Sequence, residues 1–274
     1  FAMAAAVALG CGGGDGGADA GADAGASGGD DAPAAAVEPA GTASVSGTIS
    51  FAGTAPAGTA IDMSEEPACA EKHASAPMAY DVRVGDGGGL ADVFVYVKEG
   101  LGDMTFATPA AAVLDQDGCE YRPHVLGVMV GQDVTIRNSD PVLHNINTQP
   151  TENRGFNISQ PREGMESSRS FNTAEVMIPV KCDVHGWMTA YIGVTEHPYH
   201  ATTAADGSFS ISGLPAGDYV IEAWHPTLGA STMSVTVGDG EAGTADFSFS
   251  EGMAASVPMG EPVDLAHPAG HAAG

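Results

Sequence analysis

The sequence VKCDVHGWM, at residues 180–188, contains three side chains that can each bind a metal ion. Cys182, His185 and Met188 follow one another at the spacing Cys-x2-His-x2-Met. A second imidazole, His144, comes shortly after residues 132–140, which have the alternating pattern of a β-strand. A tight loop can direct the first three donors at one ion, and the fourth donor can fix this loop to a neighbouring strand.

Two imidazoles, one thiolate and one weak thioether are the ligand set of a blue-copper electron-transfer centre. We therefore expect one mononuclear copper ion bound by His144, Cys182, His185 and Met188. The first three would form a trigonal plane and Met188 the long axial ligand. The alternative, in which Cys182 is a buried structural thiol and Met188 a core side chain, leaves two well-spaced histidines unexplained.

This ligand spacing resembles that of the cupredoxins over residues 131–196, and the loop length is closest to that of the amicyanin type. In that family an asparagine follows the first histidine and ties the two ligand loops together, and Asn145 occupies this position. One departure is Asp183, where many relatives carry Ser or Thr. Hydrogen bonding near the sulfur, and with it the reduction potential, is therefore expected to differ from theirs.

The resemblance also implies where electrons enter and leave. Relatives expose the ring edge of the histidine on the closing loop, so we expect His185 to be the electron port. Gly186 and Trp187 would then shape the docking surface for a partner.

The rest of the chain is typical of short β-strands separated by glycine-rich turns, such as residues 85–89. Aromatic residues make up only 6% of the chain, which favours short strands and turns over long helices. Alternating apolar residues predict strands at residues 44–51, 91–98, 121–129, 132–137, 176–181 and 190–195, with Phe171 continuing the pattern. We therefore expect an all-β fold, with a cupredoxin-like Greek-key β-sandwich over residues 44–196.

After Glu196 the pattern changes. Residues 205–211 and 213–224 each consist of a turn followed by an alternating strand, with Asp-Gly and Pro-x-Gly in the turns. This run resembles the carboxypeptidase regulatory-like (transthyretin-like) module, which is not a peptidase, and the sequence contains no His-Glu-x-x-His motif. The resemblance implies a second, small β-sandwich over residues 197–250, whose strands would be completed by Val235, Val237, Phe247 and Phe249.

Two further cysteines, Cys69 and Cys119, remain outside the copper loop. In an oxidising compartment such a pair usually forms a disulfide. Each also has a histidine nearby, His73 and His124, so a second metal site built from these four residues is the alternative. His197, His200 and His225, near the junction of the two modules, are expected to be structural, with an additional metal site as their alternative.

Residues 1–11 resemble the end of a secretory signal that runs into a lipoprotein processing site, Ala8-Leu9-Gly10-Cys11. We expect Cys11 to carry a lipid; the alternative is an ordinary signal peptide whose cysteine is incidental. Residues 12–43 are expected to be a disordered tether, and residues 251–274 a loose tail. These features predict a lipoprotein of the periplasm or cell surface, anchored in the outer membrane by lipid alone.

The chain of 274 residues carries 35 acidic and 9 basic side chains, a net charge of −26. Such a field repels nucleic acid and anionic membrane surfaces, so we expect neither as a partner. It attracts basic proteins, and a redox partner with a basic surface, such as a cytochrome-like protein, is expected. The alternative is that the charge serves only solubility.

The combined prediction is a tethered one-electron carrier that is not an enzyme. Two alternatives stay open: a protein that stores or delivers copper through an open site, and a surface binding module in which copper is structural. A copper oxidase or nitrite reductase is disfavoured, because the sequence lacks the extra histidine clusters that those enzymes need.

Overall fold

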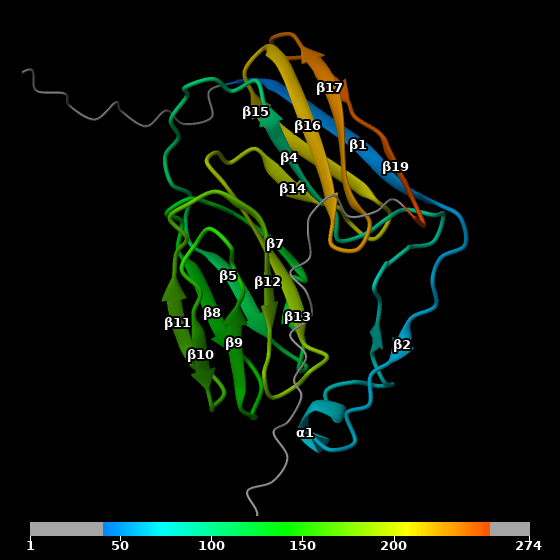
Figure 1. Ribbon diagram of the computed structural model, residues 1–274, viewed down its shortest axis with the longest axis vertical. Coiled ribbons are helices and arrows are strands. Elements are labelled where there is room, and N and C mark those ends of the chain that lie inside the picture. The colour runs from blue at the N-terminus through cyan, green and yellow to red at the C-terminus, as the bar shows by residue number, and fades with distance from the viewer. Residues whose placement is uncertain (1–40, 253–274) are drawn as a thin grey trace, which may run out of the picture. The chain divides into compact units, whose positions relative to one another are not determined.

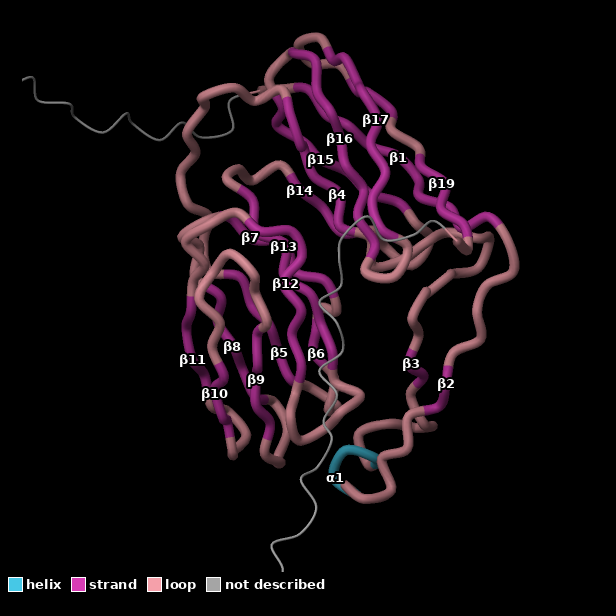
Figure 2. The backbone as a smooth tube through the Cα atoms, in the orientation of Figure 1, coloured by secondary structure: helices cyan, strands magenta, loops and turns pink. Residues whose placement is uncertain are grey.

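The computed structural model describes residues 41–252 of the chain. Within this range the structure consists of strands and loops, with one four-residue helix, α1 (Pro67–Ala70) (Figure 2). The predicted all-β class is therefore confirmed. No helix in the described part is long and apolar enough to span a membrane. The predictions for residues 1–11, for a lipid on Cys11, for residues 12–40 of the tether and for residues 253–274 of the tail lie outside the described range.

One β-sandwich carries the predicted ligand residues. Its first sheet has the order β10-β9-β12-β13-β7. The strands of this sheet are β7 (Val125–Met129), β9 (His144–Thr148), β10 (Asn157–Gln160), β12 (Glu175–Lys181) and β13 (Thr189–Thr195). The second sheet has the order β11-β8-β5-β6. Its strands are β5 (Ala112–Gln116), β6 (Tyr121–Arg122), β8 (Val134–Asn138) and β11 (Glu166–Arg169).

The core of this sandwich follows from strand alternation, because every second side chain of a strand points to the same face. Ile136 of β8, Ile146 of β9 and Ile178 of β12 are fully buried in one hydrophobic cluster. Fully burying such a side chain contributes about 1.5–3 kcal/mol. The packed core gives β9 and β12 fixed positions, and these strands hold the ligand loops.

A second β-sandwich contains both ends of the described chain. One sheet has the order β15-β1-β18, with β19 also paired to β1. Its strands are β1 (Ala43–Ala52), β15 (Ser208–Leu214), β18 (Ala242–Thr244) and β19 (Phe247–Ser250). The other sheet has the order β14-β4-β16-β17. Its strands are β4 (Phe94–Glu99), β14 (His200–Thr202), β16 (Gly217–His225) and β17 (Gly229–Val237).

The predicted domain boundary at residues 196 and 197 is corrected by these strand pairs. Strands β1 and β4, expected in the first sandwich, pair with β15 and β16 of the second, with Val45 opposite Ile211 and Val97 opposite Ile221. Figure 1 shows β1, in blue, beside the yellow and orange strands of the C-terminal half. Alternation identifies a strand but does not identify its partner. The first sandwich is thus inserted between β4 and β14, which are antiparallel neighbours.

Individual strand predictions were accurate where the alternation is strong and failed elsewhere. Residues 121–129 form two strands, β6 and β7, because Pro123 lies between them and cannot donate to a ladder. Phe171 is buried but lies outside the strands. Strands β5, β9, β10 and β11 were not predicted, since polar residues such as Asn145 and Ser167 weaken their patterns.

The chain between β1 and β4 makes a long excursion, which we call the cover segment (residues 53–93). It contains β2 (Thr59–Ala60), α1 and β3 (Met78–Ala79), with β2 and β3 paired. Cys69 in α1 is bonded to Cys119, just before β6 of the first sandwich. The predicted disulfide is therefore present, and it holds the cover segment against the sandwich that carries the ligand residues.

Candidate metal centre

The structure brings His144, Cys182 and His185 together in the interior of the first sandwich. The Nδ1 atoms of the two histidines are 3.0 Å apart, and Cys182 Sγ lies 3.8 Å from His185 Nδ1. The three side chains each offer one ligand atom, and all of these atoms lie within 4.8 Å of one another. The residues are 0%, 3% and 3% exposed, respectively. The predicted ligands therefore converge in a site closed to solvent.

Neighbouring strands produce this convergence. His144 is the first residue of β9, and Cys182 directly follows β12, which pairs with β9 through Val180 and Thr148. The turn after Cys182 returns tightly to β13. The Met188 N–H donates to the His185 carbonyl at 2.9 Å, and the Cys182 N–H donates to the Met188 carbonyl at 3.1 Å. Met188, 1% exposed, is thus held beside the other ligand residues in the same core.

The donor atoms fit a small, thiophilic metal ion. Metal–imidazole and metal–thiolate bonds of about 2.0 and 2.3 Å place trigonal donor atoms about 3.5–3.7 Å apart. The observed separations of 3.0 and 3.8 Å are close to these values. Two nitrogens and one sulfur, with Met188 beside them, match the chemistry that copper prefers.

The surroundings of Cys182 lower the pKa of its thiol. Burial alone would raise its pKa, but hydrogen bonds with the side chains of His144 and His185 and with the backbone of Asn145 lower the pKa to about 5. Metals bind the thiolate and not the thiol. The site therefore favours the form of cysteine that acts as a ligand.

Asn145 ties the two ligand loops together, as predicted. Its Oδ1 atom accepts a hydrogen bond from the Asp183 N–H at 2.7 Å and lies 3.3 Å from Cys182 Sγ. Its Nδ2 atom donates to the Asp183 carboxylate at 2.9 Å. Asn147 and Asn157 donate to the same carboxylate. Hydrogen bonds, first among them that from Asn147, lower the pKa of Asp183 and keep a negative charge beside the cysteine.

A buried carboxylate, Asp140, was missed in the sequence. Its Oδ2 atom lies 2.9 Å from His144 Nε2, the ring nitrogen that faces away from the other ligands. Burial alone would raise the pKa of Asp140, but hydrogen bonds from His144 and from the N–H groups of Cys119 and Gly118 hold it well below its usual range. The sequence feature that could have identified Asp140 is its position four residues before His144, a predicted metal ligand.

The prediction that His185 exposes its ring edge is wrong for this chain. Its Nε2 atom lies 4.0 Å from Cys69 Sγ of the cover segment. The rings of Trp187 and His185 are tilted against each other, with centroids 5.1 Å apart, and Trp187 donates its indole N–H to the Cys119 carbonyl at 3.0 Å. The ring is therefore covered by the disulfide and its neighbours. The local sequence does not show that residue 69 folds over the loop at residue 185.

The disulfide excludes the alternative of a second metal site built from these cysteines. Cys69 and Cys119 bond to each other, so their sulfurs are not free to bind an ion with His73 and His124. His73 Nε2 instead lies 2.7 Å from the Gly118 carbonyl and helps to hold the cover segment in place.

The histidines near the module junction have structural contacts. The Nε2 atom of His197 lies 2.8 Å from the Val97 carbonyl oxygen. The Nδ1 atom of His225 accepts hydrogen bonds from the N–H groups of Thr227 and Leu228. Burial lowers the pKa of both His200 and His225 to about 4. Within residues 41–252, these histidines are not among the groups that converge in a metal-binding arrangement.

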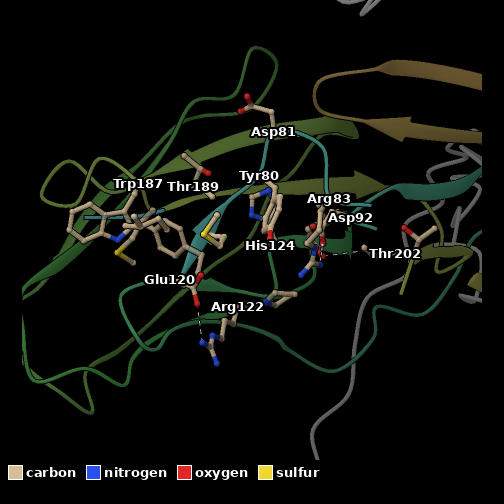
Figure 3. Close-up of a pocket in the computed structure, with 18 residues that line it drawn as sticks. Tyr80, Asp81, Arg83, Asp92, Glu120, Arg122, His124, Trp187, Thr189 and Thr202 are labelled. Carbon is tan, nitrogen blue, oxygen red and sulfur yellow. Dashed lines mark hydrogen bonds and ion pairs between the residues drawn. The ribbon is translucent and has the colours of Figure 1, made fainter. Parts of the chain in front are cut away.

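A cavity of about 620 Å³ adjoins the centre, between the cover segment and the first sandwich. Met188 contributes to its lining. Trp187 and His124 also line it (Figure 3). Its wall carries two ion pairs, Arg83 with Asp92 at 2.7 Å and Arg122 with Glu120 at 3.0 Å. Asp81 also lines the cavity, so the wall carries three carboxylates and two guanidinium groups.

Solved structures that resemble part of the chain include three copper-protein types. A Cu-containing nitrite reductase from Thermus scotoductus SA-01 is 19% identical, with a TM-score of 0.29, over 35% of this chain and only 25% of that one. A variant of amicyanin with Cu(I) is 22% identical, with a TM-score of 0.28, over 32% of this chain and 85% of that one. A purple cupredoxin from Nitrosopumilus maritimus is 24% identical, with a TM-score of 0.27, over 32% of this chain and 100% of that one.

The sequence comparisons concern the C-terminal half. No curated protein matches the chain. The carboxypeptidase regulatory-like domain family matches residues 189–250, a range that includes the module predicted at residues 197–250. Residues 189–250 therefore match the carboxypeptidase regulatory-like domain, the family that the turn-and-strand pattern predicted.

Proposed function

We propose that this protein is a one-electron carrier with a single copper ion bound by His144, Cys182, His185 and Met188. The observation that carries the proposal is the burial of three convergent donors, each at most 3% exposed, on a rigid pair of strands. When bound, copper would supply a Cu(II)/Cu(I) couple whose two states share one ligand set.

The chain's own residues then have distinct tasks. His144 and His185 supply imidazole donors from β9 and from the turn, while Cys182 supplies the thiolate. Asn145 joins the two loops, so the donors are held in place before and after electron transfer. A preformed site reduces the reorganisation that accompanies a change of oxidation state, and a carrier needs this property.

The alternatives make different demands on the site. A protein that stores or delivers copper needs ligands that open readily to solvent, whereas these ligands are covered by a disulfide-linked segment. A copper enzyme needs room for a substrate at the ion, and the buried donors favour a carrier over an oxidase or nitrite reductase. A purely structural copper ion would not need a thiolate with a depressed pKa.

The partner and the location are further proposals. The net charge of −26 favours a redox partner with a basic surface over nucleic acid or an anionic membrane. Cys69 and Cys119 form a disulfide, which is typical of compartments outside the cytoplasm. The disulfide supports a periplasmic or cell-surface location. The sequence of residues 8–11 is the basis for the further proposal that a lipid on Cys11 holds the protein at the membrane.

Copper titration of the full chain, followed by visible spectroscopy and voltammetry, tests the proposal. We expect intense blue or green absorption from sulfur-to-copper charge transfer and a reversible one-electron wave. Cys182→Ser should abolish the colour even if imidazoles still retain the ion. Met188→Leu is the matched ligand control: it should keep the colour and raise the potential. A Cys182→Ser variant with the full visible spectrum would disprove the blue-copper assignment.

A further inference from the structure

Asp140 occupies an unusual place beside the candidate metal centre. Its side chain is 1% exposed, and it contacts His144 through Oδ2 at 2.9 Å. The same oxygen accepts the Cys119 N–H at 2.8 Å, and Oδ1 accepts the Gly118 N–H at 2.9 Å. Lys72 Nζ lies 3.1 Å from Oδ1. A fully buried carboxylate is costly unless paired in this way. Its partners here are one candidate ligand, two backbone N–H groups at the disulfide and Lys72 of the cover segment.

The contact with His144 determines which ring nitrogen carries the proton. An ionised carboxylate only accepts hydrogen bonds, so Nε2 of His144 must be the donor. In the neutral ring, Nδ1 is then left with a free lone pair. This atom is the one that faces His185 Nδ1 at 3.0 Å. Asp140 thus presents His144 in the form that can bind a metal.

The remaining contacts tie Asp140 to the cover segment. Lys72 follows α1 on this segment, and Cys119 is the disulfide partner of Cys69. The loop that carries Asp140 is itself fixed, because the Asp140 N–H donates to Asn138 Oδ1 at 2.9 Å. One carboxylate therefore links a ligand of the centre to the disulfide that covers it.

We infer that Asp140 is a positioning residue for the metal centre, which fixes the tautomer and orientation of His144 and couples this ligand to the disulfide-linked cover. The inference rests on the proposed function for the identity of the ion, but not for the contacts themselves. Carboxylates that hold a ligand histidine also raise its basicity, which favours the more highly charged state of the ion. Losing this carboxylate should weaken metal binding and raise the reduction potential.

The test compares Asp140→Asn with Asp133→Asn in the full chain. Both variants remove one negative charge, but Asp133 is exposed and precedes β8, so it controls for charge alone. We expect Asp140→Asn to bind Zn(II) and Cu(II) about 10- to 100-fold more weakly, with a higher potential. We also expect altered 15N shifts of the His144 ring in the Zn(II) form. The Asp133→Asn variant should match the parent in affinity and ring shifts.

Lys72→Met provides a second variant that leaves the Asp140 side chain in place. It removes the cation that neutralises Asp140, so the carboxylate should stabilise the more highly charged ion more strongly and the potential should shift downward, opposite to the shift in Asp140→Asn. The inference would be overturned if Asp140→Asn had the same Zn(II) affinity, potential and ring shifts as the parent protein. The proposed function would survive that result as long as the copper-loaded parent protein is blue. A colourless parent would instead reject the proposed function, and the Zn(II) affinity and ring shifts would still decide the role of Asp140.

Discussion

The Nε2 atom of His185 lies 4.0 Å from the Sγ atom of Cys69, although the two residues are 116 positions apart in the sequence. This contact places a disulfide where an exposed imidazole edge was expected. Electrons that leave through His185 would have to cross the covering residues, and small molecules that approach the ion would have to displace them. Both consequences can be measured.

Removing the disulfide should open the centre. We expect Cys69→Ala with Cys119→Ala to lose copper to a chelator faster than the parent, because the cover segment is then held only by weaker contacts. The disulfide closes a loop of 50 residues. Its loss should therefore also lower the free energy of unfolding by up to about 4 kcal/mol, as chemical denaturation would report. Thr59→Ala, an exposed change on the same segment, is the control, and equal release rates in all three proteins would contradict the prediction.

A missing imidazole should be replaceable from solution, at a rate set by the cover. His185→Gly leaves a ring-sized space among buried residues, and added imidazole should restore the visible absorption. Entry should be slow in the disulfide-bonded protein and faster when Cys69 and Cys119 are also replaced by alanine. Stopped-flow absorbance measures both rates. Identical rates would mean that the disulfide does not limit access to the position of His185.

The charge of Asp183 should tune the potential. This carboxylate is hydrogen bonded to Asn145, whose Oδ1 atom is 3.3 Å from Cys182 Sγ. Removing a negative charge near the thiolate stabilises the reduced, less positive centre, so Asp183→Asn should raise the potential. The side chain is 41% exposed, so solvent weakens the effect to on the order of 30 mV, and added salt should reduce it further. Voltammetry at two ionic strengths measures this shift. An unchanged or lower potential in Asp183→Asn would contradict the expectation.

Stability should fall in acid because of His225. Its Nδ1 accepts two N–H groups, and burial lowers its pKa from 6.5 to about 4. Between these values the unfolded chain binds the proton and the folded chain does not. Stability is therefore lost as pH falls through this window, by up to about 1.4 kcal/mol per pH unit. His225→Asn keeps a hydrogen-bond acceptor near the Nδ1 position without titrating. It should therefore reduce the dependence of unfolding free energy on pH, as urea melts between pH 6.5 and 4 would show. An unchanged pH dependence would contradict the assignment.

The strand pairing predicts which truncations fold. A chain that ends at residue 196 lacks β14–β19, so β1 and β4 lose every partner strand that the structure gives them within residues 41–252. Val45, Ile49, Val95 and Val97, each at most 1% exposed, would then face water. We expect residues 41–196 to aggregate or to be degraded rapidly by protease, whereas residues 41–252 remain soluble and resistant. A soluble, protease-resistant 41–196 fragment would refute the observed domain assignment.

The sequence predicted which donor side chains converge because most of the information is local. Cys182, His185 and Met188 share one turn, so their spacing alone limits the geometry. His144 and Asn145 were identified from their order after a strand-like run and from a family resemblance. The structure adds the hydrogen bonds that join these two loops.

What could not be predicted depends on contacts between distant parts of the chain. The pattern of β1 reveals an alternating strand, but many strands have suitable faces, and only the folded structure selects β15 as its neighbour. The burial of His185 depends on Cys69, and the role of Asp140 depends on Lys72 and Cys119. In each case the decisive partner lies at least 21 residues away.

The insertion of one sandwich between β4 and β14 has a consequence for how the protein can evolve. Because these two strands are antiparallel neighbours, the inserted fold enters and leaves its host at adjacent points, so a single recombination event could graft it or remove it. The four ligand residues would travel with the graft. Cys69 and Lys72 would stay behind in the host. A descendant that received the graft alone would acquire a working set of donors with an open, unshielded imidazole, and its shield would have to evolve anew.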